Sequence, residues 1–192
     1  MLKIGFLASH NGSNVQAIVE ACNAGALQAE PCVVVSNNSR SGVLKRARVE
    51  SIAAYHLSER THPDALDGAL LATMRRHGVQ VVCLAGYMKP LGAQMLAAYR
   101  GRIVNVHPSL LPKYGGRGMY GLRVHQAVLA AGESESGATV HLVVGPYDEG
   151  AVLAQDRVPV VADDTPTTLQ ARVLAVEHRL YPAAILALGF YG

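Results

Sequence analysis

The chain has 192 residues, of which 50% are hydrophobic and 16% charged, and its formal net charge is +3. This length fits one domain with a sizeable core, and the composition excludes a disordered chain. No apolar run approaches the ~20 residues that span a bilayer, and the first residues resemble a buried strand rather than a signal peptide. Lys and Arg are scattered, which argues against a nucleic-acid binder. We therefore expect a compact cytoplasmic protein that acts on small molecules.

Strand and helix patterns alternate through the first half of the chain. Buried strands are predicted at 3–8, 31–36, 52–56, 79–84 and 101–106, and helices at 15–24, 42–49, 63–78 and 91–99. Strands that are apolar on both faces and alternate with helices predict an α/β fold: a Rossmann-like, mostly parallel sheet with helices on both faces. Sheets of this class bind ligands beyond the carboxyl ends of their strands.

The pattern changes after residue 108. A loop rich in Gly and Pro is predicted over 108–121, followed by a helix over 122–131, a β-hairpin from 137–143 and 152–160, and a long helix over 167–188. No linker separates this part from the first half. We therefore expect a single domain over 1–192, built from two lobes that share one sheet.

The strand at 101–106 delivers an amide and an imidazole. Because side chains alternate along a strand, Asn105 and His107 point to the same face. Asn105 can donate a fixed hydrogen bond, and His107 can donate, accept or carry a proton. This pair suits a reaction in which a carbonyl oxygen becomes negative while a proton moves. A strand end whose polar groups only satisfy the local backbone is the alternative.

The first strand-to-helix turn contains Asn11, Gly12, Ser13 and Asn14. Glycine allows close backbone approach, and a helix N-terminus offers free N–H groups, so the turn can bind a phosphate. Alternatively, Ser13 or Asn14 is only an N-cap. The turn matches neither a dinucleotide nor an ATP fingerprint.

Asp148 lies in the turn between the two late strands. A turn aspartate is ordinarily structural. Folded against His107, its charge would raise the imidazole pKa and favour imidazolium. The cysteines and histidines show no spacing typical of a metal site, so no metal is expected. Five histidines are expected at the surface or as caps: His56, His62, His77, His125 and His178.

The segment Asn105–Tyr114 resembles the signature of the folate-dependent formyltransferases, and so does the combination of Gly137–His141, Tyr147–Gly150 and Gln155. Within that family, 11–14 and 84–88 are similar to the members that formylate glycinamide ribonucleotide. The resemblance extends from Lys3 to about Pro182.

The resemblance implies transfer of a formyl group from 10-formyltetrahydrofolate to the amine of glycinamide ribonucleotide in de novo purine biosynthesis, without a metal. Its alternatives are a formyltetrahydrofolate hydrolase, a formyltransferase for another phosphorylated or nucleotide-linked amine, and a non-catalytic nucleotide-binding domain. The implied partners are the ribonucleotide and a reduced folate, with no nucleic acid and no membrane, and the chain is expected to be a monomer or a homodimer.

By resemblance, Asn105 donates to the formyl oxygen, His107 acts as imidazolium and supplies a proton, and Asp148 keeps the imidazole charged. About 1–100 would form the phosphate-binding lobe, and about 101–192 the catalytic and folate-binding lobe. The resemblance places the phosphate and ribose on Gly12, Ser13, Asn14 and Glu177. It places the folate on Met88, Lys89, Pro90, Leu91, Asn105, Val144, Gly145, Pro146, Tyr147 and Asp148. Core packing is the alternative for Met88 and Leu91.

One segment departs from the family pattern. Residues 113–121 are longer and richer in glycine than the corresponding loop of better-known members. This segment is either a mobile flap over the site or a plain connector.

Overall fold

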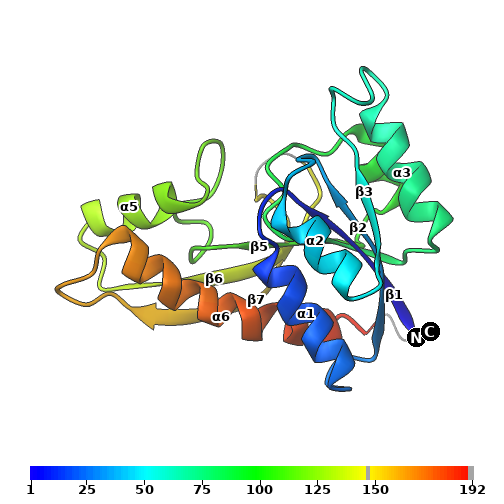
Figure 1. Cartoon of the computed structure of the whole chain (residues 1–192). Coiled ribbons are helices and arrows are strands. Elements are labelled where there is room, and N and C mark those ends of the chain that lie inside the picture. Colours follow the sequence, from blue (N-terminus) through cyan, green and yellow to red (C-terminus); the bar gives the residue numbers. More distant parts are fainter. Residues whose placement is uncertain (146–147, 190–192) are drawn as a thin grey trace.

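The structure is a computed structural model that describes residues 1–145 and 148–189. Its strands form one seven-stranded sheet in the order β3-β2-β1-β4-β5-β6-β7 (Figure 1). The pairs from β3 to β5 are parallel, and the pairs β5–β6 and β6–β7 are antiparallel. The predicted Rossmann-like, mostly parallel sheet is therefore confirmed. The strands are β1 (Leu2–Ala8), β2 (Ala29–Ser36), β3 (Ala53–His56), β4 (Val81–Leu84), β5 (Ile103–His107), β6 (Glu135–Leu142) and β7 (Val152–Pro159).

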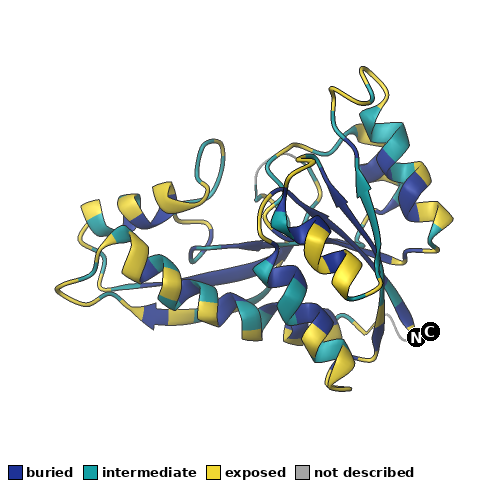
Figure 2. Cartoon of the chain, in the orientation of Figure 1, coloured by how far each residue is buried: buried dark blue, intermediate teal, exposed yellow. Residues whose placement is uncertain are grey.

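Helices cover both faces of the sheet (Figure 1). One face packs against α1 (Ser13–Asn23), α2 (Gly42–Val49) and α6 (Pro166–Ala187), and the other against α3 (Leu66–Arg76) and α4 (Ala93–Ala98). The remaining helix, α5 (Leu122–Ala130), packs on α6. Figure 2 shows the consequence: the strands between the helix layers are mostly buried, while the outer faces of the helices are exposed.

The long helix α6 fixes strand β5, which carries Asn105 and His107. It begins with a capping box at Thr165 and Thr168, with Pro166 in the first turn. Further along, the buried Tyr181 hydroxyl lies 3.0 Å from the carbonyl oxygen of Leu84 and 2.8 Å from that of Val104, and donates there. Strands β4 and β5 are thereby held against α6.

Alternation along β5 separates core from site. Val104 and Val106 belong to the core cluster beneath α1 and α6. The intervening Asn105 and His107 consequently project from the opposite face. Thus the strand contributes to the core on one face and presents functional groups on the other.

Two helices begin later than the sequence predicts. The α3 helix begins at Leu66 rather than near residue 63, because Asp64 has a left-handed φ of 57° and interrupts the helical path. The α4 helix begins at Ala93 rather than 91. Its first turn is capped by the Asp67 carboxylate of α3, which accepts from the N–H groups of Gln94 and Met95. A side chain distant in sequence thus sets that boundary. Among the described residues, no helix is long and apolar enough to cross a membrane.

Candidate active site

The turn between β1 and α1 has the geometry of an anion-binding loop. Gly12 is the N-cap residue of α1 with a φ of 72°, and the helix begins at Ser13 without a side-chain cap. The alternative prediction that Ser13 or Asn14 is the N-cap is therefore wrong. A Cβ on Gly12 would clash with the side chain of Val43. Both the left-handed conformation and the close packing require glycine here. The first turn of α1 is left without a capping side chain, as an incoming anion needs.

Helix α2 holds this turn from outside. The Val43 N–H donates to the carbonyl of His10 at 3.1 Å, and the Arg46 Nε donates to the carbonyl of Asn11 at 2.9 Å. Arg46 was not predicted from sequence. Its guanidinium adds positive charge next to the loop.

Asn14 and Glu177, predicted from opposite ends of the chain, meet in the structure. The Asn14 Nδ2 donates to the Glu177 Oε2 at 2.6 Å, and both residues are buried. Burial raises the pKa of Glu177 to about 7, although the Asn14 hydrogen bond acts in the opposite direction. The Asn14 Oδ1 is buried and has no hydrogen-bond partner among the residues that the structure describes. Such a group can take a ligand hydroxyl.

The Asn105 amide is oriented by two acceptors. Its Nδ2 donates to the Nε2 of His141 at 3.1 Å and, more weakly, to the Oδ1 of Asp148 at 3.4 Å. His141 lies opposite Asn105 on β6, and its Nδ1 donates to the Leu142 carbonyl at 2.9 Å. The same His141 Nε2 also lies 3.4 Å from the Asp148 Oδ1. One N–H of the Asn105 amide therefore makes only a long contact with Asp148, which a stronger acceptor could replace.

His107 is 4% exposed and faces an acceptor at each ring nitrogen. Its Nε2 donates to the Tyr114 carbonyl at 2.8 Å, and its Nδ1 lies 3.4 Å from the Asp148 Oδ2. Burial lowers the pKa of His107, and this effect exceeds the raising effect of Asp148 and of the Tyr114 carbonyl. The expected contact with Asp148 is present. The charge of Asp148 raises the imidazole pKa as expected, but desolvation, which penalises the charged ring, makes the net shift downward.

The backbone of Asp148 is in the left-handed region, with a φ of 56°, and its carboxylate accepts from the Gly116 N–H at 3.0 Å. Burial alone would raise the pKa of Asp148, but its contacts with His141, His107 and Gly116 together lower it. A carboxylate therefore lies beside the imidazole at neutral pH. The chain leaves β6 near the start of β5, so this turn must fold back over the sheet face to reach His107.

Three participants were not predicted as site residues: Tyr114 and Gly116 of the glycine-rich segment, and His141. The period-2 pattern of β6 contains the signal for His141, because Thr139 and His141 share one face. Nothing local indicates that backbone groups of 113–121 contact His107 and Asp148. This segment therefore contacts the site through its backbone.

Buried polar side chains support the backbone behind His107. The Thr139 hydroxyl donates to the Ser109 carbonyl at 2.6 Å and accepts from the Leu111 N–H at 3.0 Å. The Gln155 amide donates to the Leu111 carbonyl at 2.8 Å. These bonds fix the chain immediately after the catalytic strand.

The residues predicted to bind folate lie near Asn105. Strand β4 pairs with β5, with Leu84 opposite Asn105, so the segment after β4 begins beside the catalytic strand. In that segment Met88 and Leu91 are half-buried, while Lys89 and Pro90 are exposed. Leu91 also packs against the core beneath α3 and α4, which supports the alternative of core packing for this residue.

The second predicted folate segment is only partly described. Val144 is 60% exposed, and Gly145 is half-buried. Pro146 and Tyr147 lie outside the described residues. An exposed apolar residue here fits a surface that a ligand covers.

One histidine differs from expectation. His125 on α5 is 1% exposed, so its expected position at the surface is wrong. It lies in the buried stripe of α5 with Val124 and Val128. Burial, together with the charge of His107, lowers the pKa of His125 to about 4, and its Nδ1 has no partner.

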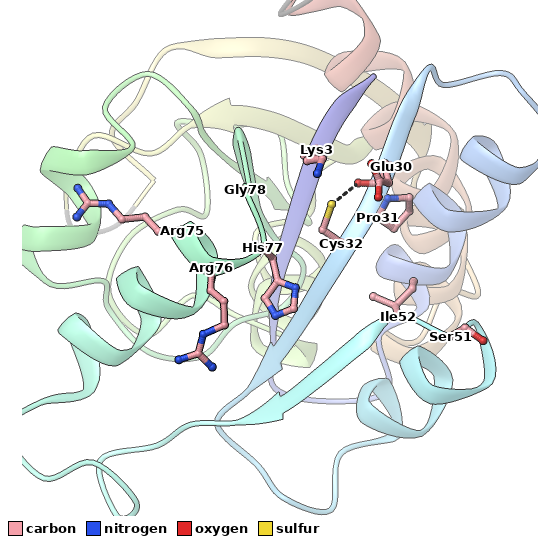
Figure 3. Close-up of a pocket in the computed structure, with 10 residues that line it drawn as sticks. All are labelled: Lys3, Glu30, Pro31, Cys32, Ser51, Ile52, Arg75, Arg76, His77 and Gly78. Carbon is pink, nitrogen blue, oxygen red and sulfur yellow. Dashed lines mark hydrogen bonds between the residues drawn. The ribbon is translucent and has the colours of Figure 1, made fainter.

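One cavity lies away from these residues. It has a volume of about 520 Å³ and lies at the amino ends of the parallel strands, with Lys3, Cys32 and His77 in its lining. Figure 3 shows Arg75 and Arg76 extending away from Cys32 and Glu30, so its cationic groups do not converge on one point. A smaller cavity of about 240 Å³ adjoins the segment after β5, with Leu111, Tyr114 and Glu133 in its lining. Across 1–145 and 148–189, no group of three or more His, Cys, Asp or Glu side chains could hold a metal ion.

Comparison with known proteins agrees with this geometry. The formyl transferase family matches residues 2–185. Phosphoribosylglycinamide formyltransferase of Escherichia coli K12 is 39% identical over 186 residues, which cover 96% of this chain and 85% of that protein. The chloroplastic phosphoribosylglycinamide formyltransferase of Arabidopsis thaliana is 39% identical over 97% of this chain, which spans only 65% of the plant protein.

A solved structure shows the same fold. Glycinamide ribonucleotide transformylase 1 from Symbiobacterium toebii superposes with a TM-score of 0.90 at 40% identity, over 97% of this chain and 86% of that one. The protein thus has an α/β fold in which an amide, an imidazole and a carboxylate meet at strand β5. The chain belongs to the formyl transferase family, as the sequence resemblance predicts.

Proposed function

We propose that the chain is a phosphoribosylglycinamide formyltransferase, which transfers the formyl group of 10-formyltetrahydrofolate to the amine of glycinamide ribonucleotide in purine biosynthesis. The observation that carries this proposal is the convergence of Asn105, His107 and Asp148 on one face of β5. The uncapped start of α1 follows β1, and β1 lies two strands from β5 in the same sheet. The names of the relatives support the same substrate.

Asn105 is the donor for the formyl oxygen. When the amine attacks the formyl carbon, that oxygen becomes negative, and an anion accepts a hydrogen bond more strongly than a neutral carbonyl. The Asn105 N–H that now makes the 3.4 Å contact with Asp148 can turn to this oxygen. The amine of the substrate is itself the nucleophile, so the chemistry needs no serine or cysteine nucleophile.

His107 moves the proton. Because burial lowers its pKa, the ring is neutral before reaction and can accept the proton that the attacking nitrogen loses. Asp148 and the Tyr114 carbonyl stabilise the imidazolium that forms. The imidazolium then protonates the folate nitrogen as its bond to the formyl carbon breaks, which returns the ring to its neutral form. This sequence replaces the predicted resting imidazolium and conserves the proton.

The ribonucleotide binds at the other end of the site. Gly12, Ser13 and Asn14 supply the backbone N–H groups for the phosphate. Glu177, held by Asn14, is placed to accept from the ribose hydroxyls. The folate lies along Met88, Lys89, Pro90 and Leu91 and along 144–148, beside Asn105. About 1–100 therefore serves as the phosphate-binding lobe and about 101–192 as the catalytic and folate-binding lobe.

The location and assembly of the chain are further parts of the proposal: a cytoplasmic enzyme that is a monomer or a homodimer. Light scattering coupled to gel filtration distinguishes the two states. Neither state changes the site described above.

Incubation with 10-formyltetrahydrofolate, with and without glycinamide ribonucleotide, tests the activity. We expect release of tetrahydrofolate only when the ribonucleotide is present. Equal release without it would instead indicate the hydrolase, and release only with another phosphorylated or nucleotide-linked amine would indicate a different formyltransferase. The absence of release with any of these would indicate a non-catalytic domain.

A further inference from the structure

The glycine-rich segment 113–121 contacts both partners of the imidazole–carboxylate pair through its backbone. The Tyr114 carbonyl accepts from the His107 Nε2 at 2.8 Å, and the Gly116 N–H donates to the Asp148 Oδ2 at 3.0 Å. The position of this segment therefore decides how His107 and Asp148 face each other.

The start of the segment adopts an unfavourable conformation. Tyr114 has a φ of 55°, in the left-handed region that bulky residues avoid. Such a residue persists only where its surroundings hold it in place. The next residue, Gly115, packs so closely that a Cβ there would lie 2.5 Å from a methyl carbon of Leu111.

A single carboxylate oxygen outside the catalytic centre holds this start. The Oε1 of Glu133, on the connection between α5 and β6, accepts from the Tyr114 hydroxyl at 2.9 Å and from the Lys113 Nζ at 2.8 Å. These two bonds lower the pKa of Glu133, and burial with the nearby carboxylate raises the pKa of Tyr114. At neutral pH the pair is thus a carboxylate and a phenol, with the phenol as donor.

We propose that Glu133 is a positioning residue for the transfer, an inference that rests on the proposed function. Glu133 touches none of the reacting groups. It holds the Tyr114 phenol, and the backbone of Tyr114 then directs its carbonyl at the His107 Nε2. This acceptor keeps a proton on Nε2 and sets Nδ1 as the nitrogen that faces the Asp148 carboxylate.

The contact with the Tyr114 carbonyl changes the pKa of His107 in one direction. The Tyr114 carbonyl raises the pKa of His107 by favouring the protonated ring, within a net shift that burial makes downward. Loosening that carbonyl therefore lowers the imidazole pKa further. The other titratable groups near His107 are Asp148, His141 on β6 and His125 on α5, and none of them contacts Glu133 in the described part of the chain.

The test uses Glu133→Ala, Tyr114→Phe and Glu133→Gln, with Glu135→Gln as the matched control. Glu135 is two residues away and pairs with Arg157 on β7. The measurements are kcat and KM with both substrates, and an NMR titration of the His107 ring in the ligand-free enzyme. The titration needs no substrate. A failure of the proposed function, with no formyl transfer by the wild type, is therefore distinguishable from a failure of this inference.

For Glu133→Ala and Tyr114→Phe we expect kcat about tenfold lower, since small misplacements of catalytic groups cost this much or more, with KM values nearly unchanged. The His107 pKa should shift downward in both, and the double variant should be no worse than either alone. Glu133→Gln keeps an acceptor oxygen and should restore most of kcat and of the His107 pKa. Glu135→Gln should match the wild type.

A folded Glu133→Ala enzyme with wild-type kcat and wild-type His107 pKa would overturn the inference. So would a loss of kcat that Glu133→Gln shares in full while the His107 pKa does not move, because that pattern indicates only a stability role. Circular dichroism and the unfolding midpoint establish that each variant is folded.

Discussion

The proposed phosphate-binding turn and the proposed catalytic centre are built in different ways. The turn between β1 and α1 is local: its conformation follows from Gly12 and from the helix that begins at Ser13. The catalytic centre instead joins groups from β5, β6, the glycine-rich segment and the turn after β6. A local turn binds an anion with fixed backbone groups, whereas proton transfer requires titratable groups whose surroundings set their pKa values.

The largest expected effect separates chemistry from binding. Asn105→Ala removes an oxyanion donor and His107→Ala removes the group that moves the proton, so each should lower kcat by about 10²–10³. KM for the ribonucleotide should change little, because its phosphate binds elsewhere. Steady-state kinetics with both substrates measure this.

A matched control is His77→Ala, since His77 lies on the cavity at the opposite end of the sheet. It should retain wild-type kcat. A folded His107→Ala enzyme with nearly normal kcat would remove His107 from the mechanism.

The second expected effect concerns stability and pH at Glu177. Its folded pKa of about 7 exceeds the ordinary 4.5, so between these values the folded state binds more protons than the unfolded state. Stability therefore falls as pH rises through this window, by up to about 3 kcal/mol. Glu177→Gln retains an acceptor for Asn14 but cannot ionise, and it should not show this loss.

Urea unfolding of both proteins at pH 5 and pH 8 measures the difference. The advantage of Glu177→Gln over the wild type should grow towards pH 8. A difference that is the same at both pH values would contradict the raised pKa.

The smallest expected effect is at the turn itself. Gly12→Ala introduces a Cβ that clashes with Val43 and forces a left-handed conformation on alanine, which should cost about 2 kcal/mol of stability. Among folded molecules, KM for the ribonucleotide should rise while kcat changes less. Gly25→Ala is the control, because Gly25 has a similar φ of 73° but open space at its Cβ.

Equal effects of the two glycine substitutions on KM would contradict the role of the turn. An effect of Gly12→Ala on kcat as large as that of His107→Ala would contradict the separate roles of the two regions in binding and in chemistry.

Much of the fold is predictable because its elements depend on residues that are close together in the sequence. The buried run Val81–Leu84 and the alternation around Asn105 give their strands directly. The starts of α3 and α4 are not predictable in this way, since one depends on a left-handed residue at Asp64 and the other on Asp67 capping a neighbouring helix.

The same difference between local signals and contacts of distant segments applies to the site. Gly12 and the pair on β5 can be identified from spacing. The contact of Asp148 with His107, the bond between Asn14 and Glu177 and the backbone contacts of Tyr114 and Gly116 join segments far apart in sequence. The sign of the His107 pKa shift depends on burial, which no spacing reveals. The buried position of His125 could have been recognised from its place in the apolar stripe of α5.

The proposed function requires this site to pass a formyl group from a folate to the amine of a ribonucleotide. The most direct measurement follows an isotopically labelled formyl carbon of 10-formyltetrahydrofolate by mass spectrometry, in the presence of glycinamide ribonucleotide. The account predicts that the label appears on the ribonucleotide with the wild-type enzyme and is strongly reduced with His107→Ala. Label recovered as free formate, with none on the ribonucleotide, would contradict it.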